Sequence, residues 1–226
     1  MPEATENRID LKAQTLTFFR QSGWLVVANT ACGAFMTLVH SVTSHMTGGD
    51  YPLFQTLLRV FLILSIPAAG LQTVLAQQAA RSVSPVELME LKGIIRAALV
   101  GTFAVWVAAV VILILFQTTI MTQLQVTNPM ALWMTVLTAL PALWLPVLQG
   151  TLQGTQTFSW LGSSMIFNGV VRFSAMVLLI VVFNGKATSA MVAAFLGVFG
   201  SLCLAAWPMR SLLVNVKALV WRTWLV

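Results

Sequence analysis

Charged residues are scarce in this chain. They make up 8% of its 226 residues, and hydrophobic residues make up 58%, whereas an average soluble domain has about 25% charged residues. A chain with so few charges cannot cover a water-facing surface. The composition therefore excludes an ordinary soluble domain and predicts a polytopic protein of the lipid bilayer.

Acidic residues are the scarcest charges, and none falls inside an apolar run. The chain has six, namely Glu3, Glu6, Asp10, Asp50, Glu87 and Glu90. Transporters that exchange a substrate for protons or cations usually rely on carboxylates within the membrane. The distribution of these six residues therefore counts against such an antiporter.

Groupings that indicate catalysis or metal binding are missing from the sequence. It contains no nucleophile paired with a base, no metal-ligand spacing and no phosphate-binding loop, so we expect no enzyme activity, no catalytic residue, no metal and no cofactor. Cys32 and Cys203 both lie inside apolar runs, which favours buried free thiols over a disulfide. The net charge of +6 is spread over the ends of apolar runs, which is typical of membrane orientation and not of nucleic-acid binding.

Six apolar runs are long enough to cross a bilayer, which takes about 20 residues. The sequence predicts these spans at residues 23–45, 53–79, 97–116, 130–152, 158–184 and 187–207. The pattern indicates an all-α, polytopic membrane helix bundle. We divide the chain into a cytoplasmic or interfacial segment over 1–21, a six-helix transmembrane lobe over 22–208, and a basic, aromatic interfacial segment over 209–226.

Shorter features mark the ends of these runs. Residues 1–10 are polar, which predicts disorder, and residues 11–19 have the composition of a short amphipathic helix at the interface. Ser84 and Glu87 fit a capping box, which predicts a helix start. Residues 117–128 are uncharged and rich in threonine and glutamine, which predicts a loop.

Basic residues are distributed unequally between the two sides of the membrane. With six spans and a cytoplasmic N-terminus, the outside loops hold only Lys186. The cytoplasmic segments hold Arg8, Lys12, Arg20, Arg81, Lys92, Arg96, Arg210, Lys217 and Arg222. Because lysine and arginine accumulate on the cytoplasmic side, this asymmetry predicts a multi-pass protein of the cell (inner) membrane with both termini in the cytoplasm.

The fifth run carries an arginine near its centre. Arg172 cannot lose its charge, and an arginine at mid-membrane costs between about 2.5 and 17 kcal/mol, depending on how far the bilayer deforms. Ser164, Asn168 and Arg172 follow one another at steps of four residues, so they share one helical face. We expect this face to point to the bundle interior, where it either binds an anionic substrate or holds neighbouring helices together.

Two further polar features lie in the first and second runs. Asn29, Gly33, Thr37 and Ser41 form a second stripe, for which packing between helices is the simpler explanation and cavity lining is the alternative. Arg59 lies about 10 Å of helix rise from the start of the second run. Its charge can therefore also extend to the nearby interface.

Three motifs follow one another along the chain. Residues 48–54 read GGDYPLF after the first run, residues 148–158 read LQGTLQGTQTF between the fourth and fifth, and Arg172 follows in the fifth. In order and spacing they resemble the "GpeeYGlf", "rgllqGlqrF" and "llRl" motifs of the polysaccharide-type flippases in the multidrug/oligosaccharidyl-lipid/polysaccharide exporter superfamily. The resemblance covers about residues 16–210. Pro52 stands where the family usually has glycine, so the geometry of that turn stays open.

The resemblance implies a function and a partner. Members of the family have two lobes and move lipid-linked oligosaccharides by alternating access, and this chain corresponds to the N-terminal lobe. The implied function is flipping of an undecaprenyl-pyrophosphate-linked oligosaccharide or polysaccharide precursor during envelope polysaccharide biosynthesis. A fragment of a longer protein fits this pattern, and so does a half-size protein that pairs with a second six-helix lobe or with its own copy.

Five residues are the predicted substrate contacts. Arg172 and Arg59 would attract the pyrophosphate of the anionic lipid-linked sugar, while Asn29, Asn168 and Ser164 would line the cavity. Two alternatives stay open, because polar stripes also serve helix packing. They are a drug/cation antiporter of the same superfamily and a non-transporting membrane subunit of a polysaccharide synthase complex.

Overall fold

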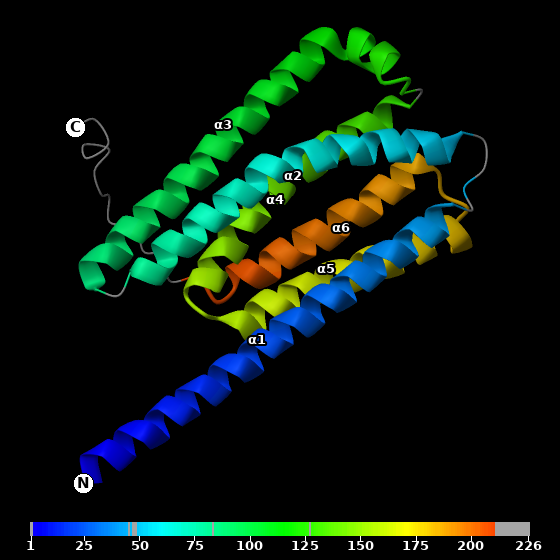
Figure 1. Cartoon of the computed structure of the whole chain (residues 1–226). Coiled ribbons are helices and arrows are strands. Elements are labelled where there is room, and N and C mark those ends of the chain that lie inside the picture. Colours follow the sequence, from blue (N-terminus) through cyan, green and yellow to red (C-terminus); the bar gives the residue numbers. More distant parts are fainter. Residues whose placement is uncertain (1, 45, 47–48, 83, 127, 211–226) are drawn as a thin grey trace.

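The computed structural model describes residues 2–44, 46, 49–82, 84–126 and 128–210, and this part of the chain contains helices and no strand (Figure 1). The helices are α1 (Pro2–Thr43), α2 (Asp50–Arg81), α3 (Pro85–Gln123), α4 (Pro129–Gly154), α5 (Phe158–Met176), the π-helix η1 (Val177–Val182) and α6 (Ala187–Ala206). Six segments, with α5 and η1 counted together, are long and apolar enough to cross a membrane. The predicted all-α fold with six spans is confirmed.

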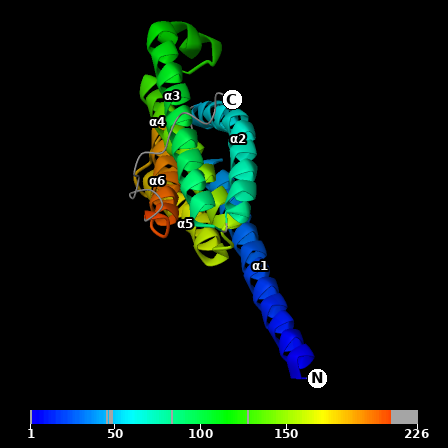
Figure 2. The same cartoon turned by 90° about the vertical axis from the view of Figure 1, so that its left-hand side faces the viewer.

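Helices α4 and α6 lie at the centre of the bundle and are its most buried spans. Helix α4 contacts α2 and α6, while α6 packs on α5 and α5 packs on α1 (Figure 1). Helix α3 lies at the edge, where it contacts α4 and α2 (Figure 2). The bundle is therefore a chain of helix pairs, with α1 and α3 as its outer members.

The helix connections gather at two opposite ends of the bundle. Figure 1 shows the α2–α3 and α4–α5 connections at one end, here called the terminal end, toward which the N-terminal part of α1 also extends. The other three connections form the loop end. Lys186 lies at the loop end. Of the other described basic residues, Arg8, Lys12 and Arg20 lie in the N-terminal half of α1, and Arg81 and Arg210 lie at the terminal end. Lys92 and Arg96 lie in the first third of α3, which begins at that end.

Two apolar clusters fill the bundle, one toward each end. The largest fully buried side chains of the loop-end cluster are Phe54, Leu57, Met176 and Met191. Those of the terminal-end cluster are Leu75, Leu91, Ile95 and Leu152. On α5 the clusters are represented by Leu161 and Met176, so the polar stripe of residues 164–172 lies between them.

Helix α3 is attached to α4 by two tryptophan side chains. Trp106 Nε1 on α3 donates to the carbonyl of Val136 (2.8 Å), and Trp144 Nε1 on α4 donates to the carbonyl of Leu99 (3.2 Å). Each helix thus supplies one donor. In a bilayer these bonds have no competing water.

The predicted organisation of the first 21 residues is corrected by the structure. Disorder was expected over 1–10 and a separate short helix over 11–19, but α1 is one helix from Pro2 to Thr43. No glycine or proline occurs between Pro2 and Gly23. Nothing in the local sequence therefore interrupts the helix, and proline at its first position is compatible with a helix start.

Helix α3 also extends further than predicted. The expected loop over 117–128 begins only after Gln123, because the threonine- and glutamine-rich tract lacks glycine and proline and continues the helix past a kink at Phe116 (φ −117°, ψ 23°). The capping box of Ser84 and Glu87 at the start of α3 is confirmed. Apart from Met209 and Arg210, the segment predicted over 209–226 lies outside the described residues.

Glycines on α4 let α2 approach closely. A Cβ added at Gly150 would meet the backbone carbonyl of Gln72, and one at Gly154 would meet the carbonyl of Ala76. At this crossing Gln72 Nε2 also donates to Gln153 Oε1 (3.4 Å). Small residues at a helix crossing in a membrane strengthen association through close backbone contact.

Gly150→Ala should therefore destabilise the protein. The added methyl group has no room against the Gln72 backbone, and overpacking costs about 1–3 kcal/mol. Thermal unfolding in detergent measures the effect. Gly101→Ala on α3, where an added Cβ meets nothing within 4 Å, is the matched control and should keep the midpoint of the parent. Equal midpoints for the two variants would contradict the close α2–α4 approach.

Candidate functional site

Ser164 ties three helices together. Its hydroxyl donates to the carbonyl of Leu161 (2.8 Å) and accepts from Gln149 Nε2 of α4 (3.3 Å). Its carbonyl accepts from the hydroxyl of Ser201 on α6 (2.7 Å). Ser164 and Ser201 are fully buried. The structure thus places Ser164 in a hydrogen-bonded junction of α4, α5 and α6.

Asn168 and Arg172 continue this face of α5 and pack on Gly197 of α6. A Cβ added at Gly197 would lie 2.8 Å from Arg172 Cβ, 2.8 Å from Asn168 Oδ1 and 2.9 Å from the Asn168 carbonyl oxygen. Gly197 therefore has no space for a side chain. The prediction that the Ser164–Asn168–Arg172 stripe faces the bundle interior is confirmed.

Two atoms of this face are buried and have no hydrogen-bond partner. They are Asn168 Oδ1 and Arg172 Nε. One is an acceptor and the other a charged donor, and they belong to residues one helical turn apart. Leaving such groups unmatched costs about 1–3 kcal/mol each, and more for a charged group. By contrast, Ser164 Oγ, the polar atom of that side chain, both donates and accepts a hydrogen bond.

Helix α1 closes the other side of α5. Gly162 contacts Ala28, and Gly169 contacts Phe35, so the two contacts are seven residues apart on each helix and the helices run in the same direction. The Phe35 and Phe173 rings lie 5.9 Å apart between centroids. Cys32 of α1 is a half-buried free thiol.

Arg59 is not part of this cluster. It is exposed on α2, and α2 packs on α4, α3 and α6 and has few or no contacts with α1 and α5. Arg59 and Arg172 nevertheless lie at comparable depths, about 14 Å from the start of α2 and about 15 Å from the end of η1, at 1.5 Å of rise per residue. The structure thus places two arginines at one level on separate helices.

Asn29 is exposed on α1, together with Gly33, Thr37 and Ser41. A Cβ added at Gly33 would meet nothing within 4 Å, and the Thr37 hydroxyl donates to the Gly33 carbonyl of its own helix (3.1 Å). The exposed Asn29 and the open position of Gly33 are therefore available to line a cavity or to contact another protein.

Sequence reasoning missed two residues of the site. Gln149 lies in a turn motif, and Gly197 was only a glycine in an apolar run. Their importance comes from contacts with another helix, at Ser164 for Gln149 and at Asn168 and Arg172 for Gly197. No local spacing carries that information. Among the described residues, no group of histidine, cysteine and acidic side chains could hold a metal ion.

Comparison with known proteins identifies the fold. The sequence matches no protein-family model and no curated protein. An outward-facing multidrug resistance transporter of the MATE family, MOP superfamily, is similar in structure with a TM-score of 0.69 and 13% identity, over 83% of this chain and 44% of that chain. A MOP superfamily transporter from Pyrococcus furiosus, described as having a binding pocket of reverse polarity, has a TM-score of 0.69 and 14% identity, over 90% of this chain and 46% of that one.

These similarities define the class of fold. The chain has the fold of about half of a MATE-type transporter and spans less than half the length of either solved relative. This confirms the prediction that the chain has the fold of one lobe of a two-lobe transporter. At 13% and 14% sequence identity, the similarity to these two structures shows a shared fold alone.

Gly197→Ala tests the geometry of the α5–α6 contact. The added methyl group forces α6 away from Asn168 and Arg172, and we expect a loss of about 1–3 kcal/mol from overpacking. Gly70→Ala on α2, where an added Cβ meets nothing within 4 Å, is the control. Thermal unfolding of both variants in one detergent is the measurement, and an unchanged midpoint for Gly197→Ala would refute the contact.

Proposed function

We propose that this chain is one half of a transporter that flips a lipid-linked oligosaccharide or polysaccharide precursor across the cell (inner) membrane during envelope polysaccharide biosynthesis. The observation that carries the proposal is Arg172, a permanent positive charge at mid-span whose Nε is buried without a partner. A guanidinium fork matches the oxygen atoms of a phosphate group. The pyrophosphate that links lipid and sugar is such a group.

The charge distribution supports an anionic substrate. Asp50 and Glu87 lie in the first turns of α2 and α3, and Glu90 is the sixth residue of α3, so all three lie away from the span centres. Arg172 lies near the middle of the Phe158–Val182 span, and Arg59 lies about 14 Å along α2. An interior with fixed positive charge and no carboxylate favours binding of anions over cations.

A second lobe completes the proposed transporter. The two solved relatives are more than twice as long as the stretch that this chain matches. Asn29 of α1 is exposed, and lipid cannot satisfy its side-chain amide. We propose that a second six-helix lobe, or a second copy of this chain, faces α1 and α2 and encloses the substrate between the two lobes.

A drug/cation antiporter of the same superfamily is the second candidate. In its favour, one solved relative is a multidrug resistance transporter. Against it stands the lack of a carboxylate at the centre of any described span, because antiport coupled to cations or protons usually relies on such carboxylates.

Replacing Arg172 distinguishes a substrate-binding role from a structural one. Arg172→Lys keeps the charge but loses the fork, so transport activity should fall only partly. Arg172→Ala should abolish activity while membrane insertion persists, since the variant loses a costly residue. The measurement is complementation of a flippase-deficient strain in the complete two-lobe protein, divided by the amount of inserted protein.

Arg81→Ala is the matched control for this test. Arg81 is the exposed last residue of α2, at the terminal end, outside the proposed site, and its loss should leave activity per molecule unchanged. If Arg172→Ala retains normal activity per molecule, Arg172 is not a substrate contact. Reduced abundance with normal specific activity would assign it a structural role instead.

Two exposed serines test the proposed orientation. Ser44 lies at the loop end and Ser159 at the terminal end, and replacing serine with cysteine changes little else. In a background lacking Cys32 and Cys203, a membrane-impermeant thiol reagent added to intact cells should label Ser44→Cys and not Ser159→Cys, because the basic terminal end faces the cytoplasm. Labelling in the reverse pattern would invert the topology.

A further inference from the structure

Helix α5 does not continue as an α-helix to its end. The π-helix η1 (Val177–Val182) extends it toward the loop end, and the N–H of Phe183 donates to the carbonyl of Leu178, five residues earlier (3.2 Å). In an α-helix such a bond spans four residues. η1 therefore holds one residue more than an α-helix would over the same stretch, here called the surplus residue. Single π turns of this kind occur frequently at functional sites.

The connection from η1 to α6 has no room for the surplus residue. It consists of the four residues 183–186, and Asn184 among them already has a left-handed conformation (φ 50°). The N–H of Gly185 donates to the carbonyl of Leu179 (2.8 Å), and a Cβ added at Gly185 would meet this same carbonyl. Ala187, the first residue of α6, is fully buried. The surplus residue can therefore move only in the other direction, into α5.

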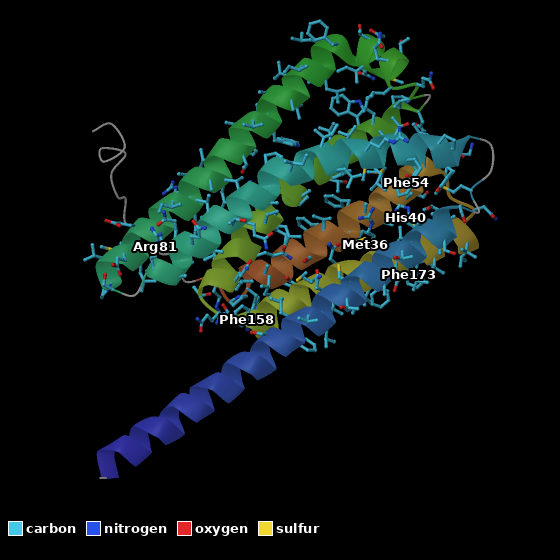
Figure 3. The ribbon with its side chains drawn as sticks, in the orientation of Figure 1. Met36, His40, Phe54, Arg81, Phe158 and Phe173 are labelled. Carbon is cyan, nitrogen blue, oxygen red and sulfur yellow. The ribbon has the colours of Figure 1, made fainter. Side chains whose placement is uncertain are left out.

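Movement of the surplus residue into α5 would turn the helix at Arg172. One residue of an α-helix corresponds to about 100° of rotation and about 1.5 Å of rise. If the π turn moves to the N-terminal side of Arg172, residues 172–177 each take the place now held by the residue before them. Phe173, labelled beside α1 in Figure 3, now packs on Phe35 (5.9 Å between ring centroids). It would then replace Arg172 in the contact with Gly197.

Two properties of α5 keep the cost of such a turn low. Every residue from Ala175 to Phe183 is apolar, so rotation brings no polar side chain of this stretch into lipid. Val177 would take the place of the fully buried Met176 in the loop-end cluster, and one apolar side chain would replace another. In addition, Arg172 Nε and Asn168 Oδ1 have no hydrogen-bond partner in the described arrangement, so the turn breaks no bond at these atoms.

We propose that η1 is a conformational switch that turns Arg172 into and out of the substrate site. With the surplus residue in η1, Arg172 holds its described position and attracts the anionic group of the substrate. With the surplus residue on the N-terminal side of Arg172, the uncharged Phe173 takes that position and the anion is released. The inference rests on the proposed function, to which it adds a step between binding and release.

Deletion of one η1 residue tests the switch. Without Val181, whose side chain is exposed, the stretch has the length of a plain α-helix, and the segments before and after it keep their described directions. Membrane insertion and the thermal unfolding midpoint should therefore stay as in the parent, whereas transport should be lost because no surplus residue is left to move. Deletion of Val182, which is also exposed, should have the same effect. Transport is measured by complementation of a flippase-deficient strain in the complete two-lobe protein, per inserted molecule.

Two control variants separate the loss of the surplus residue from other effects. Val181→Ala shortens the same exposed side chain but keeps the number of residues, so it should retain transport. Deletion of Val170, in the α-helical part of α5, should lower the unfolding midpoint, because it rotates one side of the helix by about 100° against its neighbours.

Two results would overturn the switch. One is normal transport per molecule after deletion of Val181 or Val182. The other is a loss of unfolding midpoint in both η1 deletions as large as that in the Val170 deletion, because the stretch would then hold no surplus residue.

Hydrogen exchange, followed by mass spectrometry on the full chain in nanodiscs, distinguishes this proposal from the flippase proposal. Movement of the π turn opens backbone hydrogen bonds over residues 172–182, so the amides there should exchange faster in the parent than in the Val181 deletion. If the parent shows this difference but does not complement, the switch stands and the flippase proposal is wrong. If the parent complements but exchange is equal in both proteins, the switch is wrong and the flippase proposal stands.

Discussion

A guanidinium that keeps its charge in the middle of a bilayer is the constraint on which this bundle depends. The cost of Arg172 in lipid, at least about 2.5 kcal/mol, requires that α5 be enclosed, and α1 and α6 enclose it. Gly197 permits α6 to approach, and Ser164 fixes α4 and α6 to the same face. A native protein rarely leaves buried polar atoms unmatched, so Arg172 Nε and Asn168 Oδ1 are the natural place for a ligand under the proposed function.

The polar face of α5 separates two apolar clusters in the interior of the bundle. One lies toward the loop end around Phe54, the other toward the terminal end around Leu152. Each cluster joins residues from several helices, so both ends of the bundle are well packed, while the polar face between them is held by the hydrogen bonds of Ser164 and the close packing of Gly197. Under the proposed function, this arrangement places the substrate contacts at mid-span.

Hydropathy alone determines the number and rough limits of the spans, because backbone groups in lipid must be satisfied within helices. The inward direction of Ser164, Asn168 and Arg172 also follows from their spacing. Helix ends were less predictable: α1 and α3 continue through polar stretches, because polarity does not break a helix without glycine or proline. Contacts such as Ser201 with Ser164 or Gly197 with Asn168 join different helices, and only tertiary packing creates them.

The two indole hydrogen bonds between α3 and α4 constrain the position of α3 more than their energy suggests. Hydrogen bonds between membrane helices average only about 0.6 kcal/mol, and α3 has few other neighbours. Yet Trp106 and Trp144 donate in opposite directions at two separate levels, so α3 is attached to α4 at two points along its length. Sliding α3 along α4, or rotating it about its own axis, breaks both hydrogen bonds together. The two bonds therefore fix the register of α3 against α4.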